Sequence, residues 1–126
     1  MQDLLTSKNL CLIFGFVFIA VGILGFIPNP LVSETGIFAV NPAHNLVHLI
    51  SGVVFLSGPL VFKGQEPTVL KIMAAVYALV AILGFFMAGD GMLLGIIHVN
   101  QADKWLHVAL AAAFVGSVFI AQDAVT

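Results

Sequence analysis

The stretch LCLIFGFVFIAVGILGFI, residues 10–27, runs for 18 residues without a charged side chain. At 1.5 Å per residue, a helix of this length covers about 27 Å, close to the ~30 Å hydrocarbon core of a bilayer. It is longer than the ~7–15 apolar residues of a signal-peptide core, and the PNP that follows lacks the small residues of a cleavage site. We therefore expect an uncleaved transmembrane helix here.

Three more uncharged stretches of similar length follow, at residues 46–62, 72–88 and 105–122. Apolar residues make up 61% of the 126-residue chain and charged residues 8%. Ordinary soluble domains have roughly 45–50% and 25% of these classes. The sequence therefore predicts an all-α membrane protein, a single domain at residues 1–126 that forms a bundle of four transmembrane helices in a lipid bilayer.

The few charged residues exclude one class of partner and predict an orientation. The chain has four lysines, no arginine and a net charge of −2, so it has no basic surface for nucleic acid. Lys8, Lys63 and Lys71 flank the spans on one side of the membrane, and Lys104 lies on the other. Because positive charge favours the cytoplasmic side, we expect both termini in the cytoplasm and the protein in the plasma (inner) membrane.

Two parts of the chain resemble each other at a constant offset of 59 residues. Residues 36–48 align with 95–107, so that Asn41 matches Asn100 and His48 matches His107, and residues 21–26 align with 80–85. The offset predicts two repeat units, at about residues 8–62 and 67–122. Each unit has two spans, so both are helical hairpins with the same orientation. Small residues at Ala109, Ala113 and Ser117 predict the packing face of the fourth helix.

The sequence NPAHNLVH at residues 41–48, together with NQADKWLH at residues 100–107, resembles a bacterial family of small four-span integral membrane proteins labelled only as a domain of unknown function. The resemblance covers nearly the whole chain. It implies four transmembrane helices, and it brings no activity that can be transferred to these residues.

The two matching histidines are the first candidates for a cofactor site. His48 and His107 lie past the first apolar residues of their spans, where an imidazole without partners costs free energy. If the second and fourth helices face each other, the two rings converge and can hold a metal ion or a haem iron. Four residues after each histidine lies a small residue, Gly52 or Ala111, which we expect to leave room for a flat macrocycle.

A wider set of residues can be expected to bind a transition metal. His44 lies one helical turn before His48, and Asp103 takes the place of His44 in the second unit. Three histidines and one aspartate suit copper or zinc, so His44, His48, Asp103 and His107 form the candidate metal site. Asn41 and Asn100 fall at the predicted helix starts and are expected to cap them.

Other interpretations of these residues need no cofactor. Each imidazole can form a hydrogen bond with a loop carbonyl or an asparagine, or can take part in a proton or ion relay. Ser51 and Ser57 are expected to bond to their own helix. Cys11 belongs to the opposite end of the bundle from the histidines, so no nucleophile meets a base and we expect no enzyme.

The first hypothesis for function is therefore a structural or accessory role, in which the protein packs against other membrane proteins or forms a homo-oligomer. The alternative is a haem- or metal-binding membrane protein that uses His48 and His107, with a possible role in electron transfer.

Overall fold

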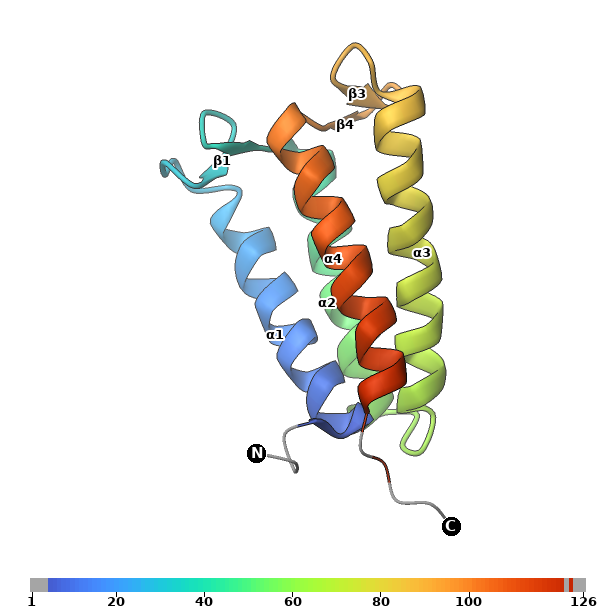
Figure 1. The fold of residues 1–126 in the computed structure, drawn as a ribbon. Helices are drawn as coiled ribbons and strands as arrows, with labels where there is room; N and C mark the ends of the chain where they lie inside the picture. The colour runs from blue at the N-terminus through green and yellow to red at the C-terminus, as the bar shows by residue number, and fades with distance from the viewer. Residues whose placement is uncertain (1–4, 122, 124–126) are drawn as a thin grey trace.

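The computed structural model describes residues 5–121 and Asp123, and in this part of the chain four long helices run side by side (Figure 1). They are α1 (Ser7–Leu24), α2 (Pro42–Leu60), α3 (Glu66–Met87) and α4 (Gln101–Ile120). Each is long and apolar enough to cross a membrane. The predicted all-α bundle of four transmembrane helices is confirmed. Gln122, the predicted end of the fourth span, lies outside the described residues.

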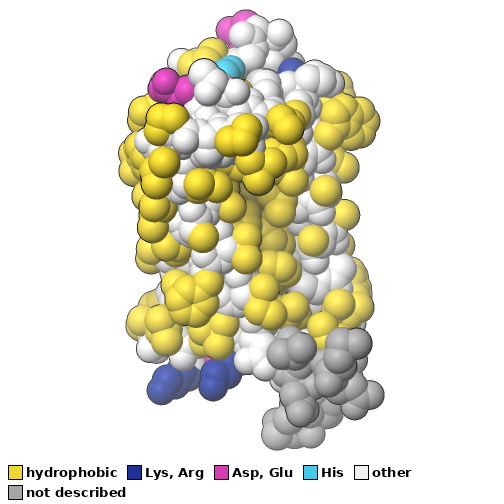
Figure 2. Space-filling model, turned by 90° about the vertical axis from the view of Figure 1, so that its left-hand side faces the viewer, with side chains coloured by type: hydrophobic (Ala, Val, Ile, Leu, Met, Phe, Trp, Pro, Cys, Tyr) yellow, Lys and Arg dark blue, Asp and Glu magenta, His cyan; other side chains and the backbone are white. Residues whose placement is uncertain are grey.

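The surface of the bundle is suited to lipid. Figure 2 shows apolar side chains along the sides of the molecule and charged side chains at its two ends. Phe16, Phe86 and Phe119 are 61%, 83% and 82% exposed. Soluble proteins rarely expose such continuous apolar surface, whereas lipid chains cover it without cost. The chain is a membrane protein.

The two ends of the bundle differ in the segments they contain. The start of α1, the α2–α3 turn and the end of α4 lie at one end, which we call the terminal end (Figure 1). Four short strands lie at the other, which we call the loop end. Lys8, Lys63 and Lys71 belong to segments at the terminal end, and Lys104 lies in the first turn of α4 at the loop end. The cytoplasmic location of the terminal end stays a prediction.

Asparagine caps set the start of the two helices that carry the candidate site. Asn41 accepts a hydrogen bond from the backbone N–H of His44 at 3.0 Å, and Asn100 accepts one from that of Asp103 at 2.9 Å. These bonds satisfy backbone donors that have no partner within the helix, and Pro42 in the first turn of α2 needs none. Both predicted caps are confirmed.

Helices α1 and α2 approach each other closely at two glycines. A Cβ atom on Gly52 would lie 2.7 Å from a side-chain carbon of Ile19 and 2.9 Å from the carbonyl oxygen of Gly15. Small residues allow this contact between backbones, which is a main source of helix association in lipid. The expectation that Gly52 leaves room for a macrocycle is therefore wrong, because α1 fills that space.

Aromatic side chains from all four helices fill the middle of the bundle. Phe55 and Phe114 are fully buried, and their ring centroids lie 5.1 Å apart at an interplanar angle of 62°. The predicted packing face of α4 is wrong in part: Ala109 and Ala113 are exposed, while Ser117 is buried. The buried residues of α4 are Asp103, Lys104, His107, Ala111, Phe114 and Ser117. The other members of the aromatic cluster are Phe14, Phe18 and Tyr77.

Two short strand pairs form the loop end. Strands β1 (Val32–Ser33) and β2 (Phe38–Ala39) pair in parallel, whereas β3 (Met92–Leu93) and β4 (Ile97–His98) pair antiparallel. In the first pair, the side chain of Asn29 accepts a hydrogen bond from the N–H of Val32 at 2.8 Å and donates one to its carbonyl at 2.6 Å. The loops before α2 and α4 therefore differ in structure.

Candidate functional site

Three buried histidines meet at the loop end of the bundle. His44 and His48 come from the first two turns of α2, and His107 comes from the second turn of α4. They are 2%, 6% and 4% exposed. Each contributes one ring nitrogen to a group of atoms that all lie within 4.8 Å of one another. We call these residues the histidine cluster.

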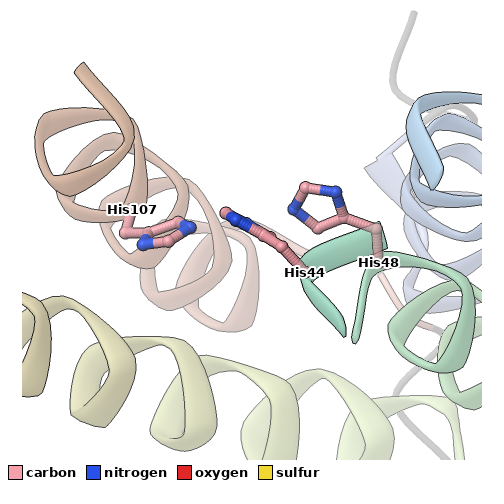
Figure 3. A group of neighbouring side chains, drawn as sticks. All are labelled: His44, His48 and His107. Carbon is pink, nitrogen blue, oxygen red and sulfur yellow. The ribbon is translucent and has the colours of Figure 1, made fainter. Parts of the chain in front are cut away.

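The ring of His44 lies between the other two (Figure 3). Its centroid is 4.5 Å from that of His48 and 5.5 Å from that of His107. Nδ1 of His44 lies 2.6 Å from the backbone carbonyl oxygen of His98 in β4. Because a carbonyl oxygen can only accept, Nδ1 carries the proton and Nε2 of a neutral His44 keeps its lone pair. In metal-binding histidines, the ring nitrogen that does not bind the metal usually donates such a hydrogen bond to a carbonyl or carboxylate oxygen.

The other two histidines have buried ring nitrogens without partners. The Nδ1 atoms of His48 and His107 form no hydrogen bond with any of the described residues. Leaving such an atom buried and unpaired costs about 1–3 kcal/mol. Their rings contact aromatic rings instead. The ring centroid of Phe18 lies 5.6 Å from that of His48, and the ring centroid of Tyr77 lies 6.4 Å from that of His107.

A small cavity of about 60 Å³ adjoins the histidine cluster. A single water needs roughly 10–15 Å³ of such space, so the cavity has room for an ion or a few waters. Pockets for cofactor-sized ligands have about 300–1,000 Å³. The cavity therefore suits a small ligand and not a haem. It is lined by the three histidines and by Val47, Ser51, Val76, Tyr77, Val80, Leu93 and Ile97.

A buried hydroxyl pair forms part of the cavity wall. The hydroxyl groups of Ser51 in α2 and Tyr77 in α3 lie 2.7 Å apart. The expectation that Ser51 bonds to its own helix is therefore wrong, whereas Ser57 does so, donating to the carbonyl of Val54 at 2.6 Å. Sequence reasoning missed Tyr77. The sequence does contain a signal for it: Tyr77 lies 59 residues after Phe18, at the repeat offset. Tyrosine differs from phenylalanine there by one hydroxyl group, which needs a hydrogen-bond partner when it is buried.

The fourth predicted metal ligand, Asp103, is used elsewhere. It is buried and belongs to α4, but it is not part of the histidine cluster. One carboxylate oxygen accepts a hydrogen bond from the backbone N–H of Asn100 at 3.0 Å, which completes a capping box with the cap of Asn100 itself. The short side chain of Asp103 thus stays at the helix start, and the predicted set of four residues is reduced to three.

The two capping asparagines also connect the two loops to each other. The amide of Asn41 donates a hydrogen bond to the carbonyl of Ile96 at 2.9 Å, and that of Asn100 donates to the carbonyl of Ile37 at the same distance. Asn41 Oδ1 also accepts from the N–H of His98 at 3.2 Å. Asn41 therefore helps to position the segment whose carbonyl holds His44.

The chemistry available to the histidine cluster is that of neutral imidazoles in a largely apolar site. Imidazole nitrogens suit zinc, copper, iron and nickel, and three of them leave a coordination position open for a further ligand. The thiol of Cys11 lies near the carbonyl of Glu66, at the start of α3 and the terminal end of the bundle. It is therefore separated from the histidines by the aromatic core.

No curated protein and no solved structure matches this chain. A family model described as "Domain of unknown function (DUF4383)" matches residues 8–120, which include the histidine cluster and all four helices apart from Ser7, the first residue of α1. The chain therefore belongs to this family of unknown function.

Proposed function

We propose that this membrane protein binds a single copper or zinc ion at His44, His48 and His107. The observation that carries the proposal is the meeting of three buried imidazoles beside a small cavity. Two of them have a buried nitrogen without a hydrogen-bond partner among the described residues. An ion or its bound water can satisfy these nitrogens. The hydrogen bond from His44 to the carbonyl of His98 further supports the proposal, because it leaves Nε2 of His44 free for a metal.

A bound ion sets the spacing of the nitrogens that hold it. Bonds of about 2.0–2.1 Å place tetrahedral ligand nitrogens roughly 3.3 Å apart, whereas the cluster spans up to 4.8 Å. Any pair of nitrogens that lies wider apart than this must move closer when the ion binds. The charge of the ion favours Cu(I) over Zn(II). Among neutral imidazoles, a monovalent copper ion carries less uncompensated charge than a divalent zinc ion. Copper would also permit electron transfer, which zinc does not.

The test is metal analysis of the full chain, purified in detergent with a tag that contains no histidine. The protein is loaded separately with Cu(I), Cu(II) and Zn(II), desalted and analysed for bound metal. We expect one ion per chain for at least one of the three, and a loss of that ion in the H44Q/H48Q/H107Q variant. His98→Gln is the matched control, because His98 contributes its backbone carbonyl to the site and not its side chain.

Two results would overturn the metal proposal. One is less than a tenth of an equivalent of each metal in the wild-type chain, with the bundle shown to be folded by circular dichroism. The other is equal metal content in the wild type and the triple variant. In either case the cavity holds water, and the histidines serve packing.

A second candidate is the accessory role in which the protein packs against another membrane protein or a second copy of itself. It is favoured by a groove of about 530 Å³ on the lipid-facing side of α3 and α4. Ala78→Phe fills this groove, and Ala75→Phe is a matched control at an exposed position outside it. Oligomeric state by native mass spectrometry should change in the first variant only; a monomer in every sample argues against self-association. The groove is lined by Ala78, Ala81, Ile82, Phe85, Phe86, Trp105, Val108 and Ala111.

We infer that the chain consists of two copies of one helical hairpin, at residues 8–62 and 67–122. The hydrogen bonds between the loops support this. Asn41 donates to the carbonyl of Ile96, and Asn100 donates to that of Ile37. The two donors lie 59 residues apart, and so do the two acceptors. Separately expressed hairpins should therefore assemble with each other when they are produced together. Buried positions recur at this offset as well: Ser7, Leu10, Cys11, Gly15, Phe18 and Gly22 of α1 match Glu66, Val69, Leu70, Ala74, Tyr77 and Ala81 of α3.

We propose that the histidine cluster lies near the outer surface of the plasma membrane, with both termini in the cytoplasm. The distribution of Lys8, Lys63 and Lys71 against Lys104 supports this orientation. In intact cells, a thiol reagent that does not cross membranes should label a Glu34→Cys variant and leave a Lys63→Cys variant unlabelled. The reverse pattern would invert the orientation.

A further inference from the structure

A second cavity lies at the loop end, on the side of the first hairpin. It has a volume of about 270 Å³ and is enclosed by the end of α1, the β1–β2 segment and the start of α2. None of its lining residues belongs to the cavity beside the histidine cluster. The lining residues are Gly25, Phe26, Pro28, Ser33, Glu34, Thr35, Pro42 and Asn45.

One lining residue of this cavity, Asn45, has a buried amide oxygen with no hydrogen-bond partner among the described residues. Asn45 is 2% exposed, and this oxygen is its Oδ1. The amide lies directly over Gly25, where a Cβ atom would come within 1.8 Å of Oδ1. Gly25 thus provides the space in which the amide fits. A buried amide oxygen without a donor is costly, so a ligand that donates a hydrogen bond is favoured here.

The charge of the lining favours a cation. Glu34 contributes an exposed carboxylate, and none of the described lining residues is a lysine. Ser33 is already occupied: its hydroxyl donates to the carbonyl of Asn29 at 2.7 Å and accepts from the N–H of Thr35 at 3.3 Å. Among the described residues, the lining therefore presents one acceptor without a donor, Oδ1 of Asn45, together with one negative charge.

The remaining walls of the cavity are apolar. Phe26, Pro28 and Pro42 can pack against short methylene chains, and an aromatic face attracts cations. The lining residues come from the end of α1, the segment that follows it and the start of α2, at the loop end of the spans. Lipid headgroups are expected at this level when the four helices cross a bilayer.

We propose that this cavity binds a primary ammonium group, with Glu34 as its counter-ion and the amide of Asn45 as a hydrogen-bond acceptor. Two sources carry this chemistry: a free small amine, and the headgroup of an ethanolamine phospholipid. The site is independent of the metal proposal, because it shares no residue with the histidine cluster.

The test uses the full chain with two small cations and three lipids. Ethanolamine hydrochloride is titrated into detergent-purified protein by calorimetry, with choline chloride as the cation that has no N–H donor. Native mass spectrometry then measures which lipid stays bound after release from nanodiscs of phosphatidylethanolamine, phosphatidylcholine or phosphatidylglycerol. Retained phosphatidylethanolamine without binding of free ethanolamine identifies the lipid as the source, and binding of both identifies any primary amine.

Glu34→Gln removes the charge and keeps the size of the side chain. It should weaken binding about tenfold or more, as expected for the loss of one charge-assisted hydrogen bond. Asp90→Asn is the matched control, because it makes the same change at the loop end outside this cavity. The proposal is overturned if neither ethanolamine nor phosphatidylethanolamine binds, if choline binds equally well, or if the two variants bind alike.

Discussion

Nδ1 of His44 donates a hydrogen bond to the backbone carbonyl of His98 at 2.6 Å, which joins the first turn of α2 to strand β4 of the second hairpin. The bond fixes the protonation of the ring that lies at the centre of the histidine cluster. Asn41 holds the same strand through the N–H of His98 at 3.2 Å. The geometry of His44 therefore depends on a loop far away in the sequence.

This dependence predicts different effects for two similar cap variants. Asn41→Ala and Asn100→Ala each remove a helix cap and one inter-loop hydrogen bond, so each should lower the free energy of unfolding by about 1–2 kcal/mol. Asn41→Ala also releases the N–H of His98. It should therefore weaken metal binding by about tenfold, a typical effect of losing support for a metal ligand.

Metal affinity and unfolding by denaturant are measured for both cap variants under the same conditions. Asn100→Ala should retain the wild-type affinity for metal, because among the described residues the side chain of Asn100 forms hydrogen bonds with Ile37 and Asp103 and with neither His98 nor His44. Equal affinities for the two variants would show that the position of His98 does not affect the site.

The glycine contact between α1 and α2 predicts opposite outcomes for two Gly→Ala substitutions. In Gly52→Ala, the new methyl group meets Ile19 and the backbone of Gly15, so we expect a loss of about 1–3 kcal/mol in stability. At Gly116 in α4, a Cβ atom would have no neighbour within 4 Å. Gly116→Ala should therefore be neutral or stabilise the protein by up to about 1 kcal/mol, since alanine favours helix. Unfolding in mixed micelles measures both; a similar change in the two would argue against the close contact.

The hydroxyl pair of Ser51 and Tyr77 predicts a measurable coupling. Tyr77→Phe and Ser51→Ala should each lower stability, because each leaves a buried hydroxyl of the other residue without its partner at 2.7 Å. The double variant should cost less than the sum of the two, with a coupling of about 1 kcal/mol. Ser57→Ala combined with Tyr77→Phe serves as the control and should be additive, because Ser57 bonds to Val54 in its own helix. Additive effects for Ser51 and Tyr77 would contradict the pairing.

The four helices could be predicted from the sequence because long uncharged runs have few other structures available to them in a membrane. The two helix caps could be predicted from residue type. Asparagine strongly prefers the N-cap position, and here it is followed by a proline or by a polar first turn, both typical of a helix start. Both predictions rest on interactions within a single segment, where the order of residues contains nearly all the information.

The candidate site depended more on contacts between segments. The repeat offset predicted that His48 and His107 approach each other, and the structure places both beside His44. The bond from His44 to His98 joins two residues with no common pattern, so the sequence could not predict it. Gly52 was misread for a similar reason: a small residue marks either free space or a close helix contact, and only the neighbouring helix decides which.

X-ray absorption at the metal edge of the loaded, untagged full chain tests the central claim most directly. The account predicts a first shell with three nitrogen ligands at about 2.0 Å and the multiple-scattering pattern of imidazole rings, and it predicts that this pattern is lost in the H44Q/H48Q/H107Q variant. A first shell of oxygen alone, or an unchanged spectrum in that variant, would contradict it.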